Sequence, residues 1–113
     1  MKLSDADVTR FADMFAALGA DPRLRIMRLL LSAHPDGLVV GEIQQETGIA
    51  SSTLSHHLEK LKIDQLVSTE REKAFIRYRA NTRALEELLG FLYAECCTRN
   101  RAIEGKRILA LCK

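Results

Sequence analysis

Apolar residues recur at three- and four-residue spacing near both ends of the chain, which predicts two amphipathic helices. The first covers residues 4–19, where Ser4 can cap the helix and Gly19 ends it. The second covers residues 82–97 and begins after a cap at Asn81 or Thr82. The apolar stripes are Val8, Phe11, Ala12, Phe15 and Leu18 in the first helix, and Leu85, Leu88, Leu89, Leu92 and Cys96 in the second.

Another helix is predicted directly after the first. It starts at Asp21-Pro22, which we interpret as an N-cap followed by proline at the first helical position. The turn HPDG at residues 34–37 closes it. We expect a core stripe of Leu24, Met27, Leu30 and Leu31, with Arg23, Arg25 and Arg28 on the opposite face.

Residues 40–64 have the pattern of a helix-turn-helix. After a short extended piece at 38–40, a helix is expected over about 41–47, and Gly48 ends it. The following segment, IASSTLSHHLEKLKI, places Leu54, Leu58 and Leu61 on one face of a further helix. Two short helices joined by a three- or four-residue turn with glycine are the signature of this motif.

The period changes to that of strands over residues 66–79. The runs LVSTER and AFIRYR favour strands and flank Glu72-Lys73, which predicts a small hairpin, or wing. The tail, 98–113, contains Gly105 and forms either a sixth short helix or an irregular end. The expected fold is therefore a single domain over 1–113, mainly α, with five or six helices and a two-stranded wing.

Composition adds constraints on location and class. With 47% apolar and 28% charged residues, the 113-residue chain is typical of a soluble globular domain. No stretch is apolar enough to span a bilayer, and the N-terminus lacks the apolar region of a secretory signal. We therefore expect a cytoplasmic protein without membrane contact, in which the three cysteines stay reduced.

Charge distribution and short polar residues point to DNA. The net charge is only +2, but residues 51–80 and 98–113 are both basic. The face of the 51–63 helix opposite its leucines carries hydroxyl and imidazole groups near the N-terminus, which suit contacts to phosphates and base edges. Candidate DNA-binding residues are Ser51, Ser52, Ser55 and His56 on this helix and Arg71, Lys73 and Arg77 on the hairpin, with Arg79 beside them. His57 lies nearer the apolar face and is interpreted as a packing residue.

These segments resemble the ArsR/SmtB winged-helix repressors, over residues 8 to about 97. The strongest pieces are DPRLRIMRLL and STLSHHLEKL. The resemblance implies a homodimer joined through residues 4–19 and 82–97, binding to double-stranded operator DNA, and release when a metal or metalloid binds. Three departures from the family pattern are Ala50 and Val39 at helix starts that usually carry polar caps, and Lys73-Ala74 at the wing tip in place of Gly-Arg. We expect them to weaken DNA affinity or alter register without abolishing binding.

The cysteines suggest the inducer. Two sensor sites known in the family are absent, since the third helix has no cysteine and residues 82–97 have neither histidine nor aspartate. A subgroup of arsenic-responsive repressors carries a similar Cys-Cys pair at the end of the fifth helix. Cys96 and Cys97 match that pair, and Cys112, much further along than the family's third cysteine, is the candidate third ligand. Thiolates select soft ions, and the nearby basic residues favour thiolate forms, so we expect As(III) or Sb(III) as inducer and no cofactor for DNA binding itself.

Distance limits the role of Cys112. A straight helix from 97 to 112 would separate the sulfurs by on the order of 20 Å, so the tail must fold back, at Asn100 or Gly105, or the ligand must come from the other subunit.

Other functions remain open from the residues alone. The cysteines could sense oxidation through a disulfide between Cys112 and one of the pair, cadmium or lead could replace arsenic, or the pair could simply pack in a dimer face. A thiol enzyme would need a histidine near its nucleophile, and His34, His56 and His57 all lie far away in sequence. We therefore expect a regulator and no enzymatic activity.

Overall fold

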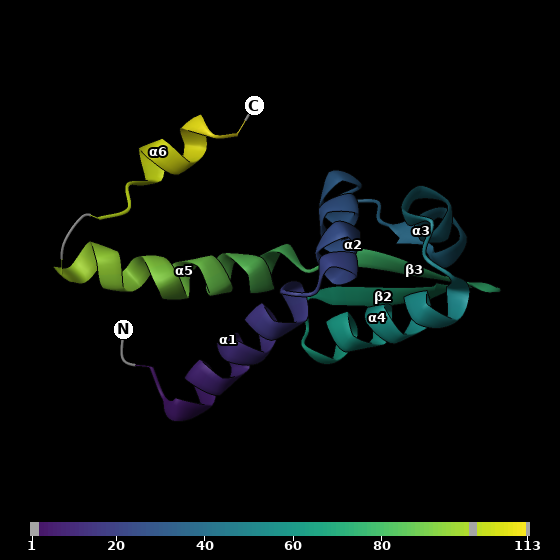
Figure 1. Ribbon diagram of the computed structural model, residues 1–113, viewed down its shortest axis with the longest axis horizontal. Helices are drawn as coiled ribbons and strands as arrows, with labels where there is room; N and C mark the ends of the chain where they lie inside the picture. Colours follow the sequence, from purple (N-terminus) through teal and green to yellow (C-terminus); the bar gives the residue numbers. More distant parts are fainter. Residues whose placement is uncertain (1–2, 100–101, 113) are drawn as a thin grey trace.

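The computed structural model describes residues 3–99 and 102–112, with side chains for residues 3–94 and 102–112. Six helices and three strands follow one another within this part of the chain (Figure 1). The molecule measures 49 × 35 × 24 Å along its principal axes. The helices are α1 (Asp5–Leu18), α2 (Asp21–Ser32), α3 (Val40–Thr47), α4 (Ser51–Ile63), α5 (Thr82–Arg99) and α6 (Gly105–Ala110), and the strands are β1 (Leu38–Val39), β2 (Val67–Glu72) and β3 (Phe75–Ala80).

Helices α1 and α5 pack against each other. Part of the predicted apolar stripe of α1 lies in this contact. Ser4 caps α1 and exchanges hydrogen bonds with Asp7 in a capping box. The ring of Phe11 stacks on Phe91 of α5 with centroids 4.7 Å apart, and an ion pair joins Arg10 to Glu87 at 3.0 Å. Phe11 is therefore part of the core of one chain, so not every residue of the predicted apolar stripe of α1 is available to a second subunit.

A single hydrophobic core fills the space between the helices and the sheet. Leu54, Leu58 and Leu61 of α4 are all buried, which confirms the predicted stripe of that helix. Gly48 ends α3 in the left-handed conformation with φ 72°, as expected for a C-terminal glycine. The buried apolar residues are Phe11, Met14, Ala17, Ile26, Met27, Leu30, Ile43, Leu54, Leu58, Leu61, Leu66, Val67, Ala80, Ala84 and Leu88.

Helix α2 is rotated relative to the sequence prediction. Its N-cap is Ala20, so Asp21 and Pro22 are already inside the first turn. Leu24 and Leu31 are exposed, whereas Ile26 is fully buried. The segment contains two overlapping helical stripes, 24/27/31 and 23/26/27/30, and α2 has neighbours on several sides, namely α1, α3, α4 and β3. Packing against all of these elements selects the second stripe, which turns Arg23 inward.

The wing contains one strand more than predicted. Strands β2 and β3 form the expected antiparallel hairpin, with Glu72 opposite Phe75 and the turn at Lys73-Ala74. The two residues of β1 pair with the other edge of β3, giving a three-stranded antiparallel sheet in the order β1-β3-β2. The predicted fold class, a mainly α winged helix-turn-helix, is confirmed.

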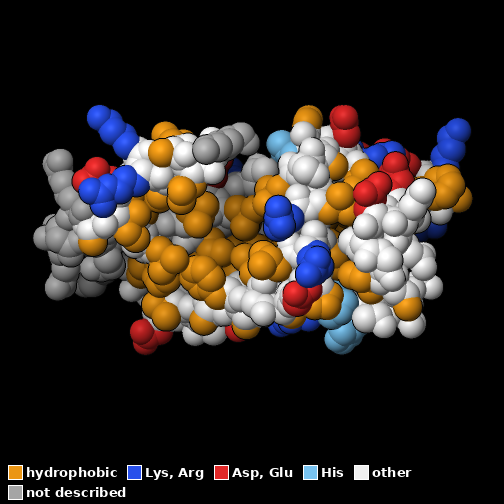
Figure 2. All heavy atoms as spheres, turned by 45° about the horizontal axis from the view of Figure 1, so that its top comes forward, with side chains coloured by type: hydrophobic (Ala, Val, Ile, Leu, Met, Phe, Trp, Pro, Cys, Tyr) orange, Lys and Arg blue, Asp and Glu red, His pale blue; other side chains and the backbone are white. Residues whose placement is uncertain are grey.

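The tail folds back along α5. Figure 1 shows α6 lying alongside α5 and running in the opposite direction. The hydroxyl of Tyr93 accepts a hydrogen bond of 3.1 Å from the backbone N–H of Gly105, which fixes the start of α6. Hydrophobic side chains gather on the half of the molecule that holds α5 and α6 (Figure 2). Among the described residues, no helix combines the length and apolar character needed to cross a bilayer.

We expect Leu58→Ala to lower the free energy of unfolding by about 2–5 kcal/mol, because it opens a cavity where α4 meets the core. Urea denaturation followed by circular dichroism, at one fixed protein concentration, measures this loss. Ile63→Ala, at an exposed position of the same helix, is the matched control and should change the free energy by less than about 0.5 kcal/mol. Equal losses in both variants would contradict the packing described here.

Candidate nucleic-acid interface

The N-terminal end of α4 and the tip of the wing lie at the same end of the molecule (Figure 1). Ser51, Ser52, Ser55 and His56 are all exposed on the first two turns of α4. Ala50 occupies the N-cap position, and no side chain caps the helix there. The first backbone N–H groups of α4 are therefore not satisfied by a side-chain cap and, with the positive end of the helix dipole, suit a phosphate group.

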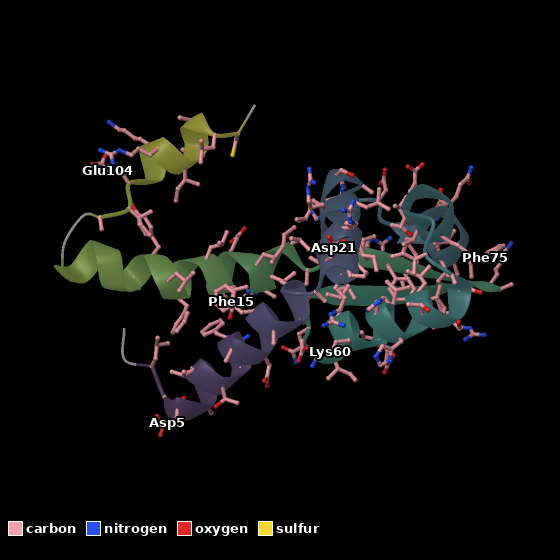
Figure 3. All side chains as sticks on the ribbon, in the orientation of Figure 1. Asp5, Phe15, Asp21, Lys60, Phe75 and Glu104 are labelled. Atoms are coloured by element: carbon pink, nitrogen blue, oxygen red, sulfur yellow. The ribbon has the colours of Figure 1, made fainter. Side chains whose placement is uncertain are left out.

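The predicted wing residues fall into two groups. Arg71 and Lys73 are exposed, and Lys73 sits in the turn itself with φ 54°, a conformation that favours glycine. Phe75 marks the tip, at the opposite end of the molecule from Glu104 beside α6 (Figure 3). Arg71 and Lys73 thus point their charge into solvent at the end where α4 begins.

Arg77 is engaged within the protein. Its Nε lies 3.0 Å from Glu72 Oε1, and its Nη1 donates to the carbonyl oxygen of Gly37 at 3.3 Å. Arg79 is held similarly, by Glu70 and by the carbonyl of Pro35. These bonds tie β3 to β2 and to the segment before β1. The DNA-binding role of Arg77 stays a prediction, and its bonds give it a structural role in holding the wing.

Arg23 links three helices and so fixes the orientation of α4. Its Nε donates to the carbonyl oxygen of Ala17, at the end of α1, over 2.7 Å. Its Nη1 lies 3.3 Å from Nδ1 of His57 on α4, so a neutral imidazole accepts this bond and carries its proton on Nε2. Burial lowers the pKa of His57, and the charges of Arg23 and His56 lower it further. His57 is thus a packing residue, as the sequence indicates, and Arg23 makes the interaction that sequence reasoning missed.

The candidate metalloid ligands are only partly described. Cys96 and Cys97 belong to the last turns of α5, and their side chains lie outside the described residues. Cys112 is an exposed free thiol after α6. Gly105 is bonded to Tyr93 and α6 runs back from there, so Cys112 follows the end of a helix that leads away from the end of α5. Within residues 3–94 and 102–112, no three His, Cys, Asp or Glu side chains are grouped to hold a metal ion.

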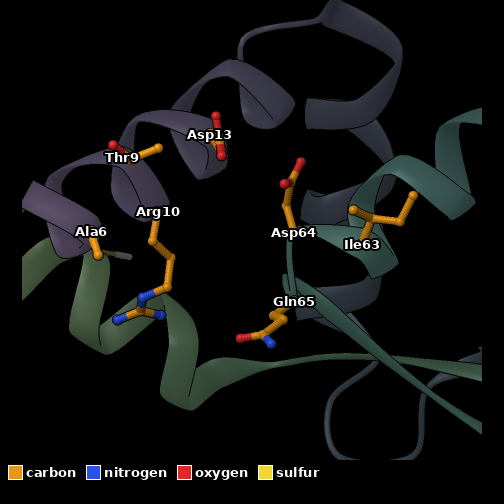
Figure 4. A pocket seen from close by; sticks show the side chains of 7 residues that line it. All are labelled: Ala6, Thr9, Arg10, Asp13, Ile63, Asp64 and Gln65. Carbon is orange, nitrogen blue, oxygen red and sulfur yellow. The ribbon is translucent and has the colours of Figure 1, made fainter.

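A polar cleft of about 380 Å³ lies between α1 and the C-terminal end of α4 (Figure 4). Arg10 in this cleft is paired with Glu87, and Asp64 lies 3.1 Å from the ammonium of Lys60. The charged groups of the cleft are therefore already paired, Arg10 with α5 and Asp64 with its own helix end. The residues lining it are Ala6, Thr9, Arg10, Asp13, Ile63, Asp64 and Gln65.

A helix-turn-helix whose second helix is exposed at its N-terminus, next to a β-hairpin, defines a winged helix-turn-helix DNA-binding protein. Comparison with known proteins agrees. The family profile described as "Helix-turn-helix domain" matches residues 16–68. Nodulation protein NolR of Rhizobium meliloti is 33% identical over 91 residues, which cover 80% of this chain and 70% of NolR.

A further relative supports the same assignment, and a solved structure agrees with the fold. The biofilm growth-associated repressor of Xylella fastidiosa is 30% identical over 90 residues, 80% of this chain and 76% of that protein. The solution structure of Mb0332 from Mycobacterium bovis, described as a homodimeric winged helix-turn-helix domain and possible ArsR-family regulator, has a TM-score of 0.65, 24% identity and coverage of 92% and 97%. The chain belongs to the ArsR/SmtB-type family of winged helix-turn-helix transcription regulators. The Xylella fastidiosa protein is named as a repressor, in keeping with a regulator and not an enzyme.

We expect Ser52→Ala and His56→Ala each to weaken binding to specific DNA by about 1–3 kcal/mol where the side chain reads a base. Lys73→Asn should weaken specific and non-specific binding alike and reduce the slope of log affinity against log salt by about one, because it removes a positive charge that faces a phosphate. Asparagine tolerates the positive φ at this position, so the turn is kept. Gel shifts at several salt concentrations measure these effects.

Lys62→Asn is the charge-matched control, at an exposed position near the opposite end of α4, and should leave the salt dependence unchanged. Unaltered affinity in Ser52→Ala, His56→Ala and Lys73→Asn would place DNA on a different surface.

Arg77→Ala should also lower thermal stability, because it removes the bonds to Glu72 and Gly37.

The pKa of His57 gives a pH prediction. Because this pKa is lowered in the folded state, folding favours the neutral imidazole, and the unfolded chain takes up the proton first as the pH falls below about 6.5. Stability is therefore fully present above that pH and declines as the pH falls towards the lowered pKa. His57→Gln keeps an acceptor for Arg23 without titrating, so its urea midpoint should decline less between pH 7 and 5. Parallel pH profiles for the two proteins would contradict this.

Proposed function

We propose that this protein is a homodimeric transcriptional repressor that leaves its operator when trivalent arsenic or antimony binds the thiolates of Cys96 and Cys97. The observation that carries the DNA-binding part is the exposed, uncapped N-terminus of α4 beside the charged tip of the wing. The chemistry of two adjacent cysteines at the end of α5 supports the inducer.

DNA recognition follows from the shape of this end of the molecule. Helix α4 would lie in the major groove, with Ser52, Ser55 and His56 reaching base edges and phosphates. Arg71 and Lys73 would lie along the backbone next to that groove and contribute the salt-dependent part of the affinity. The buried leucines of α4 face the core, so the helix can enter the groove without losing its packing.

Dimerisation is supported by the exposed apolar side chains on α1 and α5. Val8 and Phe15 of α1 and Leu89 and Leu92 of α5 are large hydrophobic residues open to solvent. The description of the Mycobacterium bovis relative as homodimeric agrees with this arrangement. A two-fold pair would present two α4 helices to sites about one turn of DNA apart, ~34 Å.

The inducer site rests on the cysteine pair. Adjacent cysteines near the end of a helix can turn both sulfurs towards one soft ion, and thiolates bind such ions in preference to nitrogen or oxygen ligands. Helix α6 runs back from Gly105, which is bonded to Tyr93, so in the proposal the third thiolate is Cys112 of the same chain or of the other subunit, or a small thiol in solution. Binding at the end of a dimer helix would change how the two subunits are oriented.

We expect Cys96→Ser and Cys97→Ser to bind operator DNA with unchanged affinity but to remain bound when arsenite is added under reducing conditions. The reason is that each variant removes one of two thiolates needed to hold the metalloid while leaving α4 untouched. A gel shift on the DNA upstream of the gene, titrated with arsenite, measures both properties.

Cys112→Ser identifies the third ligand. It should also lose release by arsenite if Cys112 of either subunit supplies the third thiolate, and should respond like the parent protein if a small thiol supplies it. Normal release in both pair variants would mean that Cys96 and Cys97 only pack. Release by peroxide but not by arsenite would indicate an oxidation sensor, and release by cadmium or lead alone would change the inducer but not the site.

A further inference from the structure

Helix α6 lacks the packing that a helix of its length needs. It has six residues, none of them buried, and isolated helices this short are not stable in water. Ile108 and Leu109 are 47% and 70% exposed. At its start, the hydrogen bond from the N–H of Gly105 to Tyr93 holds it to α5. Its apolar face therefore needs a covering surface in the working protein.

The space between α5 and α6 is an apolar groove of about 450 Å³. A Cβ added at Gly90 would meet no atom within 4 Å, so the floor of the groove is open. Leu89 and Leu92, 64% and 50% exposed, line the groove from α5 and also belong to the face that we assign to the dimer. Figure 2 shows the hydrophobic side chains of this half of the molecule as a continuous area.

We infer that α6 docks on a second copy of this chain, whose apolar side chains fill the groove between α5 and α6. The inference rests on the dimerisation in the proposed function and extends the interface from α1 and α5 to the tail. The groove continues the exposed face of Leu89 and Leu92, so a subunit that covers these leucines also reaches α6. In a two-fold dimer both subunits use the same surface, so each α6 packs against the other chain. Two equivalent apolar areas are then buried in one dimer.

Charge on the flank of α5 is complementary to α6. Glu86 is exposed and lies two helical turns before Tyr93, on the same side of α5. An antiparallel pairing of the two α5 helices, centred between Leu89 and Leu92, brings Glu86 of the partner subunit to within about one turn of Tyr93. Lys106, exposed at the start of α6 and next to the Gly105 that bonds Tyr93, then faces an opposite charge.

Sedimentation equilibrium on the full chain tests this. We expect Ile108→Asp and Leu109→Asp each to raise the dissociation constant of the dimer roughly 10- to 100-fold, because each removes an apolar side chain from both halves of the interface. Both positions are exposed in the single chain and outside its core, so far-ultraviolet circular dichroism should stay unchanged. Ile63→Asp, at a similarly exposed position (65%) on α4, is the matched control and should leave the dissociation constant unchanged.

A charge swap tests the register. Lys106→Glu should raise the dissociation constant about 2- to 5-fold, and adding Glu86→Lys to the same chain should restore it. Failure of the double variant to recover would contradict the antiparallel placement of α6 on the second subunit.

Leu92→Asp separates this inference from the proposed function. If Leu92→Asp dissociates the dimer while both α6 variants behave like Ile63→Asp, the role of α6 is wrong and the dimer of α1 and α5 stands. If neither Leu92→Asp nor the α6 variants alter the dissociation constant, the proposed dimer face itself is wrong. If the α6 variants stay fully dimeric but lose one-per-chain binding of an apolar fluorophore, the groove is a small-molecule pocket, which also overturns the inference.

Discussion

The rest of the structure depends on the packing of α4, which contacts the core through one face only. Leu54, Leu58 and Leu61 anchor the helix in the core, and Arg23 fixes its edge by bridging α1 and His57. The opposite face is exposed and is the face that we propose for DNA. A base contact is worth about 1–3 kcal/mol only if the side chain arrives at the right place, so rigid backing of the helix is part of its specificity. The core therefore works as the platform of the recognition helix.

The sequence predicts this platform well because the responsible signals are local. The leucine stripe of α4, Gly48 at the end of α3 and the cap at Ser4 all act within a few residues, and the structure has each of them. The sequence does not show which face of α2 is buried, because its apolar residues fit two helical stripes. Only packing against the neighbouring elements decides between these stripes. Likewise, no local sequence pattern predicts that β1 pairs with β3, or that Arg77 bonds to Gly37, 40 residues away in sequence.

The candidate site likewise contains residues whose exposure the sequence predicts and residues whose contacts it does not predict. Exposure of Ser52 and His56 follows from the helical period, so the exposed face of α4 could be predicted, and its contact with DNA stays a prediction. The sequence could not predict whether each arginine of the wing is bonded within the protein or faces solvent, because these two kinds of arginine look alike in sequence. Arg71 and Arg77 are both on the hairpin, yet only Arg77 faces Glu72 and the segment before β1. The sequence allows the tail either to fold back or to run on, and the bond from Gly105 to Tyr93 selects the fold back.

In the proposed function, helix α5 would connect the cysteine pair to DNA, because the helix has two different sides. Ala84 and Leu88 are buried against the core of their own chain, whereas Leu89 and Leu92 face outward. A change in the packing of α5 on a second subunit would therefore carry the whole DNA-binding body with it. The helix has 18 residues and is about 27 Å long, so a tilt of about 10° moves one end by about 5 Å relative to the other.

A displacement of that size exceeds the ~3.4 Å rise of one base pair, so it is enough to put two α4 helices out of step with half-sites one turn apart. To turn a 99% bound dimer into a 99% released one, the inducer must favour the released arrangement by about 5.5 kcal/mol. An inducer that bound both arrangements equally would shift nothing, however tightly it bound. The proposed function therefore requires thiolates that are closer to a metal-binding geometry in the released dimer than in the DNA-bound one. In the proposal the pair stands at the end of α5, where a tilt of the helix about its buried part would produce the largest displacement.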